Sequence, residues 1–260
     1  MTMVPAVAEE GGPTSLKWCT YNIQHHGGGR LQLALKAMCT MGFDFGFLTE
    51  TKIENENYAR LVGDYRVYGS HASNHQGGVA LFWKEDNDRY AIESVRGHGP
   101  NVVSFQLVTG KRRWKVVGLY IPPSETDGAT LRGAGEHRDL RNSGRSVRDT
   151  EIATVLANHG LDDMGRHFLQ RTKHRRRWTW KQRREGQSVR GRCDAIMGTD
   201  RRHFTKLRIL NPPGYDSDHL LITAEIVSSL FEGTKDPASD TRCVIEHERS
   251  RCEDERIAIV

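Results

Sequence analysis

Short apolar runs separated by turn-forming residues recur along most of the chain, and they predict a protein rich in β-strands. The run at 16–22 has the length of a strand and ends in a polar residue. The run at 114–121 is apolar enough to be buried on both faces of a sheet. Further strands are expected at 45–49, 65–68, 77–83, 90–95, 102–107, 193–197, 204–210 and 220–227.

Two stretches have helical periodicity. Leu31, Ala34, Leu35 and Met38 follow the spacing i, i+3, i+4, i+7, and Gly42 comes just after them as a stop signal. A second helix is expected over 149–159, followed by a glycine. Between the strand at 114–121 and this helix, residues 124–148 are rich in glycine and charge, and no strand is expected there.

The chain of 260 residues is long enough for one large domain. We expect a disordered leader at 1–14, a folded domain at 15–227 and a charged linker or tail at 228–260. No apolar run has the length of a membrane span, and the N-terminus has no basic secretory region. The five scattered cysteines contain no Cys-x-x-Cys pair, which favours reduced thiols in an intracellular protein.

Positive charge is concentrated in one block at 166–192, where Lys and Arg far outnumber the single acid, Glu185. Trp178 and Trp180 lie inside this block. Basic side chains with aromatic rings between them suit phosphate neutralisation and base stacking. A solvated basic loop or a nuclear-targeting run is the alternative interpretation. The candidates for nucleic-acid contacts are Arg175, Arg176, Arg177, Trp178, Trp180, Arg183 and Arg184.

Polar side chains stand at or next to the ends of four expected strands: Asn22, Glu50, Tyr120 and the pair Asp218-His219. A carboxylate such as Glu50 is a suitable ligand for a hard divalent cation, which also binds phosphate oxygens. A histidine near its ordinary pKa of about 6.5 can exchange a proton at neutral pH. Singly, each residue could equally be a solvated strand end, a turn residue or a core aromatic.

Six short motifs occur in an order that resembles the endonuclease/exonuclease/phosphatase superfamily. The resemblance is strongest to the apurinic-type endonuclease domain of non-LTR (LINE-type) retrotransposons, and it covers residues 15–227. The motifs are Tyr21-Asn22-Ile23, Leu48-Thr49-Glu50-Thr51, Gly77-Gly78-Val79-Ala80, Gly118-Leu119-Tyr120-Ile121-Pro122-Pro123, Arg192-Cys193-Asp194 and Ser217-Asp218-His219.

The resemblance implies an α+β fold, a four-layered α/β/β/α sandwich of two mixed sheets. It also implies hydrolysis of phosphodiesters assisted by Mg²⁺ or Mn²⁺. Glu50, helped by Asn22, would bind the metal ion, and Asp218 would lie near it. Tyr120 would support the phosphate, while His219, oriented by Asp194, would contact the phosphate or the attacking water. The segment Trp178-Thr179-Trp180 would flank the DNA groove.

Two departures from the family pattern stand out. Gln24 occupies a position where some members have an acid. The Gly-Asp-x-Asn motif, which ends a buried strand and aligns the attacking water, is absent between Pro123 and Arg192. The resemblance therefore predicts a fold lacking one core strand and one helix. A degenerate element copy and a wrongly spliced gene model both explain this.

Three functions agree with these observations. The first is a metal-dependent endonuclease domain of a retrotransposon that nicks DNA, with activity reduced by the absent motif. The second is a catalytically inactive remnant that binds nucleic acid. The third is a phosphatase of small phosphoesters or lipids, against which the basic, tryptophan-bearing block argues. For the endonuclease we expect a monomer that acts on DNA in the nucleus and was once fused to a reverse transcriptase.

Overall fold

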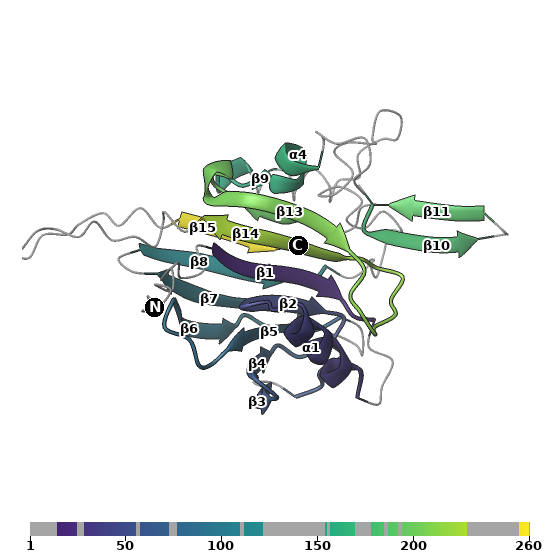
Figure 1. Cartoon of the computed structure of the whole chain (residues 1–260), viewed down its shortest axis with the longest axis horizontal. Coiled ribbons are helices and arrows are strands. Elements are labelled where there is room, and N and C mark those ends of the chain that lie inside the picture. Colours follow the sequence, from purple (N-terminus) through teal and green to yellow (C-terminus); the bar gives the residue numbers. More distant parts are fainter. Residues whose placement is uncertain are drawn as a thin grey trace, which may run out of the picture.

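The computed structural model describes residues 15–24, 29–55, 58–72, 77–109, 112–121, 154, 157–169, 178–184, 187–191, 194–227 and 255–259. Two mixed β-sheets pack face to face (Figure 1). The first sheet has the order β13 (Phe204–Leu210), β14 (Leu221–Val227), β1 (Ser15–Asn22), β2 (Phe45–Thr49), β5 (Val79–Lys84), β4 (Tyr65–Gly69), β3 (Tyr58–Val62). The second has the order β6 (Ala91–Gly97), β7 (Val102–Thr109), β8 (Arg112–Leu119), β15 (Glu255–Ile259), β12 (Ile196–Gly198), β9 (Asp162–Asp163).

Three further elements lie around these sheets. The strands β10 (Trp180–Arg184) and β11 (Gln187–Gly191) form a separate hairpin, which projects beyond the sheets at the same end as the connection between β13 and β14 (Figure 1). The short helix α4 (Met164–Phe168) packs beside β12 and β13, and a 3-10 turn, η1 (Arg201–His203), leads into β13. Every helix in the described part of the chain is too short or too polar to traverse a bilayer.

Alternation along the central strands of the first sheet produces two hydrophobic layers. In β1, Trp18 faces the second sheet, whereas Cys19 and Tyr21 face the opposite way. In β2, Phe47 belongs to the layer between the sheets and Leu48 to the outer layer. Because successive side chains of a strand point to opposite faces, a central strand buried on both sides must be apolar at nearly every position.

The helix α1 (Arg30–Thr40) covers the outer face of the first sheet (Figure 1). Its buried residues include Leu31, Ala34, Leu35 and Met38, the four predicted from the helical spacing. Gly42 follows with a φ of 72°, a left-handed conformation that glycine adopts without steric penalty, so the predicted helix end is confirmed.

The strand β15 completes the second sheet. It pairs in parallel with β8 and antiparallel with β12, so it lies between two strands that would otherwise each expose a row of backbone groups. Its residues come from the stretch expected to be a linker or tail at 228–260. The sequence predicted that one core strand is lacking, and β15 occupies a core position next to β8. This strand comes from a distant segment, so no local pattern in residues 124–192 could predict it.

Each of the expected strands has a counterpart in the structure, with ends that differ by a few residues. The strand β3 and the β10–β11 hairpin were not expected. β3 has only five residues and is largely exposed, whereas β10 consists mainly of basic and polar residues and β11 lacks an apolar alternation. Residues 124–148, the leader at 1–14, most of the expected helix at 149–159 and Arg175, Arg176 and Arg177 lie outside the described residues.

Candidate active site

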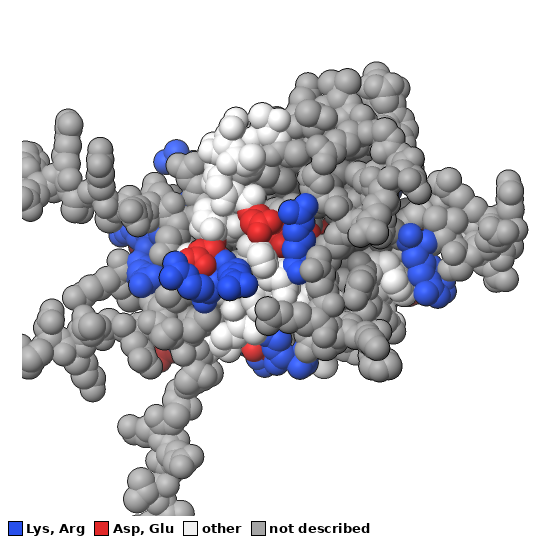
Figure 2. Space-filling model, turned by 90° about the horizontal axis from the view of Figure 1, so that it is seen from above, with Lys and Arg blue, Asp and Glu red and all other residues white. Residues whose placement is uncertain are grey.

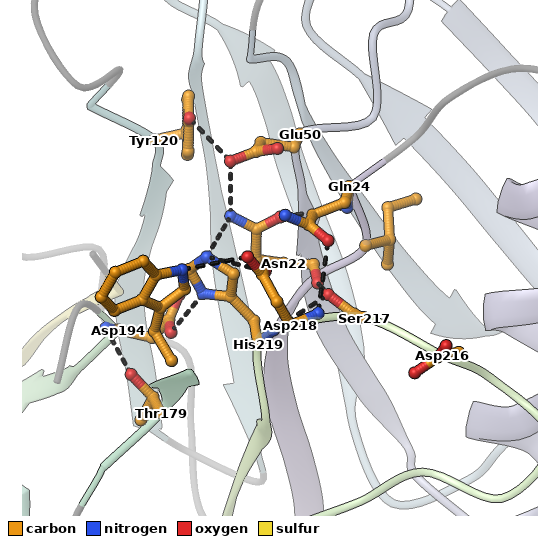
Figure 3. A network of polar contacts seen from close by, with 12 residues as sticks. Asn22, Gln24, Glu50, Tyr120, Thr179, Asp194, Asp216, Ser217, Asp218 and His219 are labelled. Carbon is orange, nitrogen blue, oxygen red and sulfur yellow. Dashed lines mark hydrogen bonds and ion pairs between the residues drawn. The ribbon is translucent and has the colours of Figure 1, made fainter. Parts of the chain in front are cut away.

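The first two polar residues of the site come together because two strands of the first sheet are parallel. β1 and β2 run side by side with Asn22 opposite Thr49, so both strands end at the same edge. The Asn22 side chain donates a 2.7 Å hydrogen bond from Nδ2 to Oε1 of Glu50 (Figure 3). Glu50 has a φ of 53°, a backbone conformation uncommon for residues other than glycine, asparagine and aspartate.

The second sheet contributes Tyr120, which directly follows β8. Its hydroxyl donates a 2.8 Å hydrogen bond to Oε1 of Glu50. One carboxylate oxygen thus receives bonds from both sheets, from Asn22 on one side and Tyr120 on the other (Figure 3). This arrangement leaves Oε2 of Glu50 as the carboxylate oxygen that accepts neither of these bonds.

His219 lies next to Asn22 and is mostly buried, with 11% of its side chain exposed. Its Nδ1 is 2.8 Å from Oδ2 of Asp194, and its Nε2 is 3.4 Å from Nδ2 of Asn22. Burial alone would lower the pKa of His219, but the charge and hydrogen bond of Asp194, together with the charges of Asp218 and Glu50, raise it above its usual value. The folded protein therefore retains the proton of His219 to a higher pH than an unperturbed histidine would.

The connection that carries His219 is tied to the N-terminal part of the chain. Arg30 in α1 donates hydrogen bonds to the Tyr215 hydroxyl and to the backbone oxygen of Asp216, and the Tyr215 hydroxyl donates to the backbone oxygen of Ile23. The guanidinium also lies over the Tyr215 ring, 4.9 Å from its centre. These contacts hold the connection between β13 and β14 against the end of β1.

Gln24 and Ser217 add shorter links at the same place. The Ser217 hydroxyl donates a 3.0 Å bond to the backbone oxygen of Asn22 and accepts one from the His219 amide. The Gln24 amide donates to Oδ1 of Asn22, and its side-chain oxygen accepts from the Asp218 amide. Gln24, in the place of an acid, therefore positions the Asp218-His219 segment in this chain.

The strand β10 joins this cluster through its first residues. Trp180 forms an isolated antiparallel bridge with His219, and its indole N–H donates a 3.0 Å bond to Oδ2 of Asp218. Thr179 was expected to flank a DNA groove, and here the structure differs. Its side chain is fully buried, and its hydroxyl accepts a 3.0 Å bond from the Asp194 amide, so it supports Asp194 from beneath.

The basic residues expected to bind nucleic acid are described only in part. Lys181 and Arg190 are paired neighbours in the hairpin and are both exposed, and Arg190 lies over the Trp178 ring. Arg183 and Arg184 lie in β10, and their side chains are outside the described part of the structure.

Elsewhere, cations alternate with acids. On the face shown in Figure 2, the described Lys and Arg side chains form separate groups with Asp and Glu among them. Surface ion pairs near β13 and α4 neutralise part of this charge: Arg202–Asp200, Lys206–Glu225 and Arg166–Asp162. Among the described residues, the cations of the hairpin, which lies next to His219, are therefore better placed to contact a nucleic acid at the site than the ion-paired cations near β13 and α4.

The donor set can be tested against a divalent metal ion. Mg²⁺ typically takes one or two protein carboxylates and completes its shell with water and phosphate oxygens. Glu50 offers Oε2, and Oδ1 of Asp218 is buried without a hydrogen-bond partner in the described structure. The described residues contain no cluster of three or more His, Cys, Asp and Glu that would hold a metal ion alone. The site therefore fits a metal ion shared with a phosphate ligand.

The Gly-Asp-x-Asn motif has no counterpart among the described residues at this edge. The sheet position next to β8 is occupied by β15, whose sequence is Glu-Arg-Ile-Ala-Ile. The only acid of β15, Glu255, pairs with Trp114 at the end of β8 away from Tyr120. Among the described residues, β15 therefore fills the strand position without supplying the acid expected to align the attacking water.

Comparisons with known proteins agree with this architecture. No protein-family model and no curated protein matches the sequence. The endonuclease domain of TRAS1, a telomere-specific non-LTR retrotransposon, has a similar structure, with a TM-score of 0.56, 16% identity, and coverage of 81% of this chain and 98% of that one. An endonuclease/exonuclease/phosphatase family protein from Leptotrichia buccalis gives a TM-score of 0.51, 16% identity and coverage of 81% and 99%. These likenesses confirm the expected α+β, DNase I-like fold.

Proposed function

We propose that this chain is an endonuclease domain that nicks DNA by metal-dependent hydrolysis of a phosphodiester bond. One observation supports the proposal above others: residues far apart in the sequence meet at one edge of the two sheets. Asn22 and Tyr120 are hydrogen-bonded to Glu50, and His219, hydrogen-bonded to Asp194, lies next to them with Nε2 3.4 Å from Nδ2 of Asn22. The structural likeness to the TRAS1 endonuclease domain adds support for DNA as the substrate.

In this proposal the metal ion is Mg²⁺ or Mn²⁺, held by Glu50 with help from Asn22 and lying near Asp218. When bound, it supplies a Lewis acid that polarises a phosphate oxygen. Asn22 and Tyr120 fix the Glu50 carboxylate by donating to the same oxygen. The fixed carboxylate would need little reorganisation when substrate binds.

His219 has the role of a hydrogen-bond donor to the scissile phosphate. Asp194 accepts from Nδ1 and so orients the ring with Nε2 toward Asn22. The raised pKa favours the protonated ring, which donates to an anionic oxygen more strongly than a neutral ring does. Tyr120 would support the phosphate beside it.

The absent Gly-Asp-x-Asn acid predicts a slow enzyme. Loss of a positioned general base typically reduces a rate about 10²–10⁴-fold. The same absence favours the second candidate function, a catalytically inactive domain that binds nucleic acid through the basic hairpin. As an endonuclease, we further propose, the domain acts as a monomer in the nucleus.

Plasmid nicking separates the two functions. The purified chain should relax supercoiled plasmid in the presence of MgCl₂ and lose this activity in EDTA, in Glu50→Ala and in His219→Ala. Glu85→Ala is the matched control, because Glu85 is an exposed glutamate after β5, at the opposite end of the first sheet. Retained DNA binding with no nicking in the wild type would support the inactive domain instead.

A further inference from the structure

A buried asparagine, Asn101, lies between the two segments that carry Glu50 and Tyr120. It precedes β7, is 6% exposed, and belongs to none of the motifs recognised in the sequence. Its side-chain oxygen Oδ1 accepts a 2.5 Å hydrogen bond from the Gly78 amide, and its backbone oxygen accepts a 2.9 Å bond from the Tyr120 amide. Asn101 therefore bonds both to Tyr120, the residue after β8, and to the segment before β5.

The segment before β5 is in turn bonded to the turn that contains Glu50. The amide of Thr51 donates a 3.3 Å bond to the backbone oxygen of Gly78, and the amide of Lys52 donates a 2.9 Å bond to that of Gly77. The Tyr120 hydroxyl then returns to Oε1 of Glu50 at 2.8 Å. These bonds close a ring that runs from Glu50 through Gly78 and Asn101 to Tyr120 and back.

Backbone strain is concentrated in this ring. Glu50 and Lys52 have φ values of 53° and 50°, and Asn101 has a φ of 65°, which asparagine adopts more readily than most residues. The conformations of Glu50 and Lys52 are uncommon outside glycine, asparagine and aspartate, and they persist where surrounding contacts fix them, often at functional sites. Space is limited as well, since a Cβ added to Gly77 would meet the Tyr120 ring at 2.8 Å and Asn101 more closely.

We propose that Asn101 is a positioning residue that fixes Glu50 and Tyr120 relative to each other and thereby sets the affinity of the site for a divalent metal ion. This inference rests on the proposed function, in which Glu50 binds the metal. Residues that hold a metal ligand in place typically contribute 10–100-fold in metal affinity when they are removed. Asn101 acts on Glu50 through the backbone ring, so it has no contact with the metal or substrate.

Two substitutions separate the Asn101 side chain from its backbone. Asn101→Gly removes the acceptor for the Gly78 amide but tolerates the positive φ. Asn101→Asp keeps an oxygen at the acceptor position. Asn87→Gly is the matched control, because Asn87 also caps a turn by accepting from backbone amides, those of Arg89 and Tyr90, at the opposite end of the first sheet. Should Asn101→Gly fail to fold, Asn101→Ser replaces it, because the shorter serine side chain does not bring its hydroxyl oxygen within reach of the Gly78 amide.

The measurements are titration with MnCl₂ alone by calorimetry, amide hydrogen exchange of the metal-free protein, and the MgCl₂ concentration for half-maximal plasmid nicking. Asn101→Gly should weaken Mn²⁺ binding at least about tenfold and speed exchange of the Gly78 amide. It should raise the MgCl₂ requirement in parallel. The Mn²⁺ affinity of Asn101→Asp should stay within about threefold of the wild-type value, a much smaller change than the tenfold loss expected for Asn101→Gly. The Mn²⁺ affinity of Asn87→Gly should match the wild-type value.

Wild-type Mn²⁺ affinity in Asn101→Gly would overturn the inference, and so would an Asn101→Asp variant as impaired as Asn101→Gly. A wild-type chain that binds no Mn²⁺ would overturn the proposed function instead. In that case exchange of the Gly78 and Tyr120 amides still decides whether Asn101 fixes the ring. Wild-type exchange rates of these two amides in Asn101→Gly would show that Asn101 does not hold the ring of hydrogen bonds together.

Discussion

The carboxylate of Asp194 lies 2.8 Å from Nδ1 of His219, although 25 residues separate them in the chain. Both side chains are largely buried, with 12% and 11% exposed. Asp194 precedes β12 of the second sheet and His219 precedes β14 of the first, so this contact joins the two sheets at the site edge. Asp194 orients the imidazole through this contact and contributes to the raised pKa of His219.

Asp194→Asn should lower the pKa of His219. The substitution removes the negative charge that raises this pKa and leaves the effect of burial, which lowers it. NMR titration of the histidine ring in EDTA would measure the shift. Asp216→Asn is a suitable control, because Asp216 is an exposed acid on the same connection and faces away from the ring (Figure 3). An unchanged His219 pKa in Asp194→Asn would contradict the assignment.

The same pair predicts how stability depends on pH. Because the pKa of His219 is raised in the folded state, its protonation stabilises the fold below the unfolded value of about 6.5, and this contribution is lost as the pH rises through the folded-state pKa. The loss of stability in Asp194→Asn should therefore be larger at about pH 6 than at about pH 9. Urea denaturation at the two pH values tests this, and equal losses would argue against the ion pair.

Thr179→Val should destabilise the protein by about 1–3 kcal/mol, because the buried Asp194 amide loses its hydrogen-bond acceptor. Valine has nearly the same shape, so packing around the fully buried side chain is retained. Urea denaturation measures the change. Thr205→Val is the control: Thr205 is exposed on β13, and its substitution should change stability by less than about 0.5 kcal/mol.

Ile257→Pro should disrupt the second sheet. Position 257 lies in the middle of β15, between Val116 of β8 and Gly198 of β12, and a proline there removes a backbone donor from a central strand. We expect a loss of about 3 kcal/mol or more, with aggregation from the newly unpaired edges. Ile257→Val, which keeps the amide, serves as control. Equal thermal unfolding of the two variants would show that β15 is dispensable.

The hairpin should give DNA binding a salt dependence. Lys181→Ala/Arg190→Ala removes two exposed cations that are paired neighbours in the hairpin, of which Arg190 lies over Trp178. If both contact phosphates, the slope of log affinity against log salt should fall by about two. Fluorescence anisotropy with labelled duplex DNA at several salt concentrations measures this. Arg66→Ala/Arg113→Ala removes two exposed arginines away from the site and should leave the slope unchanged. An equal fall of the slope in both double variants would mean that DNA is attracted by the overall positive charge and not by the hairpin.

Much of the fold was predictable from local pattern. The apolar positions of α1 and the alternation in β1 and β2 identified elements and buried faces, because these properties depend on neighbours in the sequence. The hairpin at 180–191 was not predictable in this way. Its strands are charged, and they pair with each other and with the segment at His219 through backbone bonds that any side chains permit.

Asn101 was missed at the site, and Thr179 was expected there in another role. Asn101 follows Gly99-Pro100 and has the sequence context of an ordinary turn residue, whereas Thr179 was expected to flank the DNA groove with Trp178 and Trp180. The side chain of each accepts a hydrogen bond from the backbone amide of a residue in another segment. Such a role has no residue preference strong enough to be recognised in a single sequence.

By itself, the sequence determined the helix α1, most of the strands and which polar residues stand at their ends, because these follow from periodicity and turn chemistry close along the chain. Only the tertiary structure decided that Glu50, Tyr120 and His219 meet at one edge and that residues 255–259 fill the central place beside β8. Sheet order and register arise from pairing between segments far apart in the chain, and the free energy of that pairing depends on the whole core.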